Sequence, residues 1–223
     1  MTITTAKRPL LDVGRVIQNA VVFNFKNGSD ARMNSDSLPE SVSNLFDLIH
    51  NRKIDYVMVG GIAMLLYVDG RNTEDIDLIL AVPSLKQMPE ISITDQNDFF
   101  ARGQFGDLQI DLLLTRNKLF EKVRKDFSTQ QQIVGREIRS ATVEGLLLLK
   151  LYALPSLYRQ GDFSRVGIYE NDVAALMQRY SPKTELLFKE LEKHLSKTDL
   201  DSVREIVGEI QQRIARFSKR SGE

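Results

Sequence analysis

The sequence has 223 residues, of which 42% are hydrophobic and 27% are charged, and a globular chain of this length can bury a sizeable core. Thirty lysines and arginines balance thirty aspartates and glutamates, and the resulting net charge of zero argues against a uniformly basic nucleic-acid coat protein or a polyacidic disordered chain. The absence of cysteine excludes disulfides, thiolate nucleophiles and cysteine zinc sites, and two histidines, His50 and His194, are too few for a histidine-rich metal site.

The predicted elements of the first part of the chain mix strands and helices. Pro39 suits the first turn of a helix, and apolar residues follow it at helical spacing. In chain order we expect a strand at 21–25, a polar loop at 28–37, a helix from Pro39, a strand at 56–59, a helix at 62–68, strands at 75–80, 99–105 and 108–114, a helix at 117–126 and a strand at 136–141.

After residue 141 the pattern predicts helices throughout. We expect helices at 143–154, 171–180, 183–195 and 200–217, with Pro155 ending or kinking the first. The predicted fold class is therefore α+β, a small mixed β-sheet core in residues 1–141 followed by a C-terminal helical bundle in 142–223. No apolar run approaches the roughly 18 to 20 residues that a membrane helix needs, and Met1 to Arg8 lack a secretory segment, so we expect a cytoplasmic protein.

Two acidic residues share one face of a predicted strand. Asp75 and Asp77 stand two apart and point to the same side, where their repulsion would be relieved by a divalent cation. Asp111 lies between apolar neighbours in another strand, and pairing of the two strands would place three carboxylates on one face. Such a group suits a two-metal phosphoryl-transfer site, whereas the alternative is a solvated strand face.

Gly60 and Gly61 directly follow an apolar strand and precede a predicted helix. Backbone N–H groups at such a place can approach a phosphate, and the alternative interpretation is a tight turn.

The segments Val59 to Ala63 and Arg71 to Leu78 together resemble the signature of the nucleotidyltransferase superfamily related to DNA polymerase beta. The Arg-x-Thr-x-Asp-Ile-Asp-Leu form is similar to the subgroup that contains the AbiEii/MenT-type toxins of toxin–antitoxin systems. The signature covers roughly residues 55–114 and is specific as a combination.

The resemblance implies a role for each matched residue. Gly60 and Gly61 would hold an incoming nucleoside triphosphate (NTP), such as ATP, through the backbone. Asp75, Asp77 and Asp111 would bind two Mg²⁺ ions, and Asp111 would help to deprotonate the attacking hydroxyl.

Four further residues match the family less directly. Arg71 and Thr73 belong to the extended motif, where Arg71 is a candidate phosphate contact or a solvated loop arginine. Lys150 lies in a segment that resembles the family's second conserved region and would meet the triphosphate, unless its ammonium extends to the surface. Asp172 resembles an acid at a family helix start, although Asn171 and Ala175 depart from the pattern, and it could instead cap its helix. Tyr158 and Arg159 complete the candidate residues.

We therefore predict a Mg²⁺-dependent nucleotidyltransferase that moves a nucleoside monophosphate (NMP) from an NTP to a hydroxyl or phosphate acceptor. The alternative is a catalytically silent nucleotide-binding or protein-interaction module. A toxin-like enzyme with tRNA as acceptor and a cognate antitoxin protein as partner rests on the subgroup resemblance alone.

The zero net charge conceals a segregation of charge along the chain. Residues 69–111 contain nine acids against three bases, and residues 116–139 contain seven bases against three acids. If the basic segment lies near the cleft, it could hold a polyanionic acceptor such as RNA, and the alternative is a solvated helix face.

Overall fold

A mixed seven-stranded sheet forms the core of the computed structural model, which describes residues 13, 16–17, 38–69, 73–133 and 136–218. The predicted strand at 21–25 and loop at 28–37 lie outside these residues. The strands are β1 (Tyr56–Val59), β2 (Asp75–Leu80), β3 (Ser92–Gln96), β4 (Phe100–Phe105), β5 (Leu108–Leu114), β6 (Ser128–Ile133) and β7 (Arg136–Ala141), in the order β3-β4-β5-β2-β1-β7-β6. The central strand β2 is antiparallel to β1 and parallel to β5.

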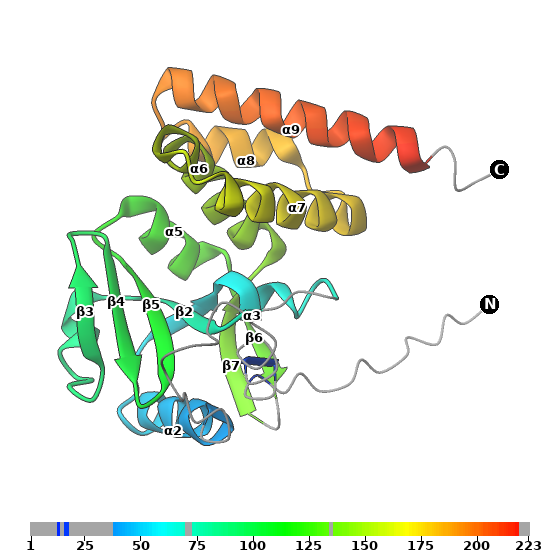
Figure 1. The fold of residues 1–223 in the computed structure, drawn as a ribbon. Coiled ribbons are helices and arrows are strands. Elements are labelled where there is room, and N and C mark those ends of the chain that lie inside the picture. Colours follow the sequence, from blue (N-terminus) through cyan, green and yellow to red (C-terminus); the bar gives the residue numbers. More distant parts are fainter. Residues whose placement is uncertain (1–12, 14–15, 18–37, 70–72, 134–135, 219–223) are drawn as a thin grey trace, which may run out of the picture.

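The helices pack around the sheet, and the two together confirm the predicted α+β class. They are α2 (Leu38–Asn51), α3 (Gly60–Met64), α4 (Val82–Leu85), α5 (Lys118–Asp126), α6 (Val143–Gln160), α7 (Phe163–Tyr180), α8 (Thr184–Leu191) and α9 (Lys197–Ser218). Helices α6 to α9 gather on one side of the sheet, with α5 between them and the strands, and α2 lies at the opposite end (Figure 1). Helix α6 contacts α3, α5 and β7, so the bundle packs directly on the sheet core.

The alternation of β2 follows the sequence pattern. Ile76 and Leu78 are fully buried on one face, whereas Asp75 and Asp77 on the other are half-buried. The parallel register pairs Asp77 with Asp111, so the two acidic strands lie side by side as the predicted metal site requires.

Several predicted helix boundaries are wrong. Pro155 does not end its helix, because α6 continues to Gln160 and stops where Gly161 adopts the left-handed conformation. Helix α7 begins at Phe163 rather than near Asn171, because the Asp162 side chain accepts a hydrogen bond from the backbone N–H of Arg165 and caps the helix. The helix predicted at 62–68 is shorter and begins at the glycine pair itself.

Among the described residues, no helix has the length and apolar character to cross a membrane.

Candidate active site

Three carboxylates converge on the two central strands. Ligand oxygens of Asp75, Asp77 and Asp111 all lie within 4.8 Å of one another. Asp111 is 5% exposed, and the other two acids are half-buried. Because hard divalent cations prefer carboxylate oxygens, this donor set fits Mg²⁺.

The electrostatics of the three carboxylates favour a cation. Burial, together with repulsion from Asp75 and Asp111, raises the pKa of Asp77 to about 7. The charge of Lys150 and a hydrogen bond from the Gly61 backbone act in the opposite direction without cancelling it. A bound divalent cation would favour the ionised form of Asp77 and remove the repulsion.

Arg102 is a residue of this site that sequence reasoning missed. Its Nε and one terminal nitrogen donate to the two carboxylate oxygens of Asp111 at 2.7 and 2.6 Å. The register of the β4–β5 hairpin places the two residues opposite each other. A hairpin interpretation of the Gly106-Asp107 turn would have revealed this pair, because Phe105 opposite Leu108 implies Arg102 opposite Asp111.

Neighbouring side chains approach Gly60 and Gly61 so closely that neither position has room for a Cβ. Gly60 has a φ of +64°, and a Cβ there would lie 1.7 Å from an Asp77 carboxylate oxygen. A Cβ on Gly61 would lie 2.5 Å from Oγ1 of Thr73, whose hydroxyl donates to Asp75 at 2.7 Å. The two glycines and Thr73 therefore position the acids of β2, and a contact of the glycine backbone with phosphate stays a prediction.

Lys150 and Asp172 form a buried ion pair that joins α6 to α7. The Lys150 ammonium lies 2.6 Å from Asp172 Oδ2, and the two side chains are 6% and 7% exposed. The alternative interpretations of these two residues are wrong. The Lys150 ammonium does not extend to the surface, and Asp172 lies inside α7 rather than capping its start. The ammonium also lies 4.4 Å from the ring centroid of Tyr169.

The remaining candidates are more exposed or fall outside the structure. The Tyr158 hydroxyl hydrogen-bonds to Glu170, and Arg159 forms an ion pair with Asp199. Arg71 lies outside the described residues.

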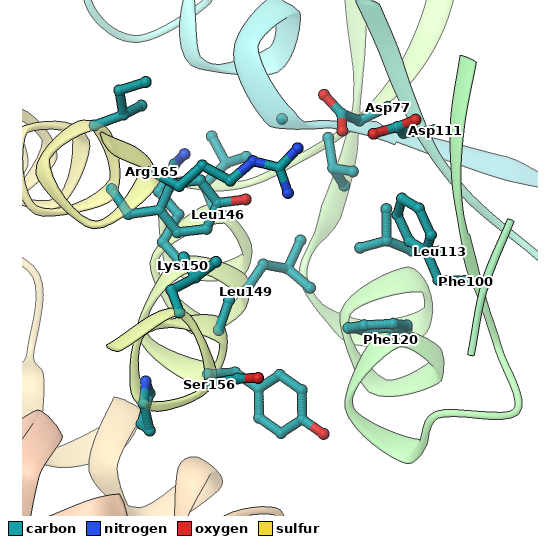
Figure 2. Close-up of a pocket in the computed structure, with 18 of the residues that line it drawn as sticks. Asp77, Phe100, Asp111, Leu113, Phe120, Leu146, Leu149, Lys150, Ser156 and Arg165 are labelled. Carbon is teal, nitrogen blue, oxygen red and sulfur yellow. The ribbon is translucent and has the colours of Figure 1, made fainter. Parts of the chain in front are cut away.

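A cleft of about 730 Å³ connects these groups, a size typical of small-molecule sites. Its sheet side carries the three acids, Gly60, Gly61 and Thr73, with Phe100, Leu113 and Phe120 as an apolar wall, and its helical side carries Leu146, Leu149, Lys150, Arg159 and Arg165. Figure 2 shows Asp77 and Asp111 on one side of this space and Lys150 and Arg165 on the helical side. The candidate residues of β2, β5 and α6 thus face one cavity.

The basic segment at 116–139 is balanced locally by acids. Its ion pairs are Arg116–Asp98, Lys122–Asp126, Arg124–Asp55, Arg124–Glu121, Lys125–Glu121, Arg136–Asp47 and Arg139–Asp55. From this segment, Phe120 is the residue that lines the cleft. The pairing favours the solvated interpretation over a free basic surface for a polyanion.

Comparison with known proteins places the fold. No protein-family description matches the sequence, and no curated protein matches it. The crystal structure of ANT(2")-Ia in complex with adenylyl-2"-tobramycin is similar, with a TM-score of 0.51 and 12% identity over 74% of this chain and 95% of that one. This likeness confirms the expected nucleotidyltransferase fold.

Two further solved structures are similar at lower TM-scores. The solution structure of the antibiotic-resistance factor ANT(2")-Ia has a TM-score of 0.49 and 13% identity over 82% of this chain and 96% of that one. An antigenic nucleotidyltransferase-like protein from Paracoccidioides brasiliensis has a TM-score of 0.44 and 20% identity over 76% and 92% of the two chains.

Proposed function

We propose that this protein is a Mg²⁺-dependent nucleotidyltransferase that moves an NMP from an NTP to a hydroxyl or phosphate acceptor. The observation that supports this most is the group of three carboxylates within 4.8 Å of one another in the wall of a nucleotide-sized cleft. In the transfer, an acceptor oxygen bonds to the α-phosphorus while the bond from that phosphorus to the bridging oxygen breaks. Pyrophosphate leaves with the electron pair, and the acceptor's proton passes to a carboxylate.

Each residue then has a defined task. Asp75, Asp77 and Asp111 would hold two Mg²⁺ ions, which stabilise charge on the phosphates when bound. Asp111 also receives the acceptor's proton, and Thr73 positions Asp75 through its hydrogen bond. The backbone at Gly60 and Gly61 contacts the triphosphate.

The helical side of the cleft completes the proposed site. Lys150 contacts the phosphates, and Asp172 positions Lys150 through their ion pair. By the motif resemblance, Arg71 is a further phosphate contact. In this proposal residues 1–141 supply the metal site, and residues 142–223 form the helical unit that covers the nucleotide.

The finer identity rests on the motif resemblance. An AbiEii/MenT-type enzyme in the cytoplasm, with ATP as donor, tRNA as acceptor and an antitoxin as partner, is the narrower version of the proposal. The paired charges of residues 116–139 do not support RNA binding there. The general transfer reaction is therefore the stronger proposal.

The test is turnover of each of the four NTPs, radiolabelled at the α-phosphate, with Mg²⁺. Acceptors include tRNA and, because the similar ANT(2")-Ia structure holds adenylyl-2"-tobramycin, aminoglycosides. We expect labelled acceptor and pyrophosphate with the wild type, and loss of both with Asp75→Ala and Asp77→Ala. Asp95→Ala, on the exposed strand β3, is the matched control and leaves turnover unchanged.

Two outcomes would contradict the proposal in different ways. Equal turnover in the wild type and in both acid variants would show that the carboxylates do not carry the reaction. Tight binding of Mg²⁺–NTP without transfer to any acceptor would instead favour the catalytically silent module.

A further inference from the structure

The cleft presents three cationic side chains from the described residues, namely Lys150, Arg159 and Arg165. A triphosphate is a polyanion, and charged donors are its strongest hydrogen-bonding partners. Two of the three cations are held close to carboxylates. Lys150 lies 2.6 Å from Asp172, and Arg159 forms its ion pair with Asp199.

Arg165 is held much more loosely. Its Nε lies 3.8 Å from an Asp162 carboxylate oxygen, at the outer limit of an ion pair. The other Asp162 oxygen accepts the backbone N–H of Arg165 at 3.1 Å as the cap of α7. The Arg165 side chain is 53% exposed, so it can move to a ligand without breaking a close ion pair.

The direction of Arg165 suits a ligand that is also bound by the acids. Figure 2 shows its side chain extending from α7 toward Asp77 and Asp111, which lie on the opposite wall of the cleft. A guanidinium presents parallel N–H donors that match two phosphate oxygens at once, whereas an ammonium binds phosphate as a point charge.

We propose that Arg165 binds the β- and γ-phosphates of the NTP, an inference that rests on the proposed function and adds a binding residue to it. With the α-phosphate at the carboxylates, the leaving pyrophosphate lies toward the helical wall that carries Lys150 and Arg165. Arg165 therefore distinguishes a triphosphate from a monophosphate, because the monophosphate lacks the groups that it contacts.

The experiment measures binding by calorimetry for the wild type, Arg165→Gln, Arg165→Lys and Arg179→Gln. Arg179 is the matched control, because it lies on the same helix, is 51% exposed and is absent from the residues that line the cleft. The ligands are the α,β-methylene analogues of the four NTPs and the corresponding NMPs, each with Mg²⁺. Circular dichroism verifies that each variant keeps its helices.

We expect Arg165→Gln to weaken triphosphate binding by about tenfold or more, as for other lost charge-assisted hydrogen bonds, and to leave monophosphate binding within about twofold. Arg165→Lys loses less, and Arg179→Gln binds like the wild type. Unchanged triphosphate affinity in Arg165→Gln, or an equal loss for both ligands, would overturn the inference. A wild type that binds no triphosphate more tightly than the monophosphate would overturn the proposed function itself.

Discussion

At the scale of single residues, Gly60 shows why this motif needs glycine. A side chain there would collide with the Asp77 carboxylate and would hold a positive φ that L residues avoid. We expect Gly60→Ala to lower the free energy of unfolding by about 1–3 kcal/mol and to abolish transfer, because Asp77 must move away from the other two acids. Urea denaturation and Mn²⁺ titration measure the two effects.

Gly167→Ala is the matched control for that substitution. A Cβ at this helical position meets nothing within 4 Å, so alanine should stabilise α7 by about 0.5–1 kcal/mol and leave Mn²⁺ binding unchanged. Wild-type Mn²⁺ affinity in Gly60→Ala would show that the position of Asp77 does not depend on the glycine.

The residues of this site differ in how well sequence alone could predict them. Asp75 and Asp77 share a face because strand side chains alternate, which is a local rule. The pairing of Lys150 with Asp172 depends on how α6 packs on α7, which no local pattern specifies. The sequence therefore predicted both residues as candidates but not their ion pair.

At the scale of elements, the ion pair between Lys150 and Asp172 links α6 to α7. Removing one partner leaves a buried charge uncompensated, so Lys150→Met and Asp172→Leu should each destabilise the protein by about 3–5 kcal/mol. The double variant should recover most of this loss, because apolar groups can replace a buried pair. Urea denaturation of the four proteins in a double-mutant cycle measures the coupling.

The same cycle separates structure from binding. If Lys150 contacts phosphate, the double variant regains stability but not NTP affinity. The exposed pair Arg52–Glu90 is the control, and its removal should change stability little. Additive losses in the Lys150–Asp172 cycle would argue against a direct interaction between the two charges.

Elements that lack an apolar pattern were the ones that sequence alone missed. The side chains of β3 are all exposed, so this strand has no buried face to produce alternation, and β6 is polar in sequence. Both lie at the edges of the sheet and are held by backbone pairing with a better-patterned neighbour, β4 or β7. The strand predicted at 99–105 corresponds to β4 (Phe100–Phe105), which sequence alone can predict because β4 has a buried face.

At the scale of the whole molecule, ion pairs bring the segregated charges of the sequence together in space. Arg124 and Arg139 both contact Asp55, and Arg136 contacts Asp47, although each partner is more than 60 positions away in the sequence. A count along the chain could show the segregation of charge but not its neutralisation in space. The candidate metal site differs, because Asp75, Asp77 and Asp111 lie within 4.8 Å of one another, although Asp111 is also paired with Arg102.

This concentration of acid predicts how the stability of the metal-free protein depends on pH. The folded pKa of Asp77 is about 7, above the ordinary value of 3.8, so its contribution to stability is full below pH 4 and is lost as the pH rises toward 7. Asparagine does not ionise, so Asp77→Asn does not lose stability in this way as the pH rises. In EDTA, the free energy of unfolding of Asp77→Asn should exceed that of the wild type by an amount that grows from pH 4 to 7, on the order of 4 kcal/mol.

Magnesium should narrow the difference between the two proteins. At a concentration about 100 times the dissociation constant, Mg²⁺ adds about 2.7 kcal/mol to the wild type at pH 8, and Asp77→Asn, with fewer charged ligands, gains less. Acids such as Glu121, whose pKa is lowered to about 2, change stability with pH in the opposite direction. Both proteins carry these acids, so their contributions cancel in the difference between the two free energies of unfolding. The opposite result is a difference in the free energy of unfolding that stays constant in EDTA from pH 4 to 8. It would mean that the fold does not oppose ionisation of Asp77, and the electrostatic argument for a cation at this site would be wrong.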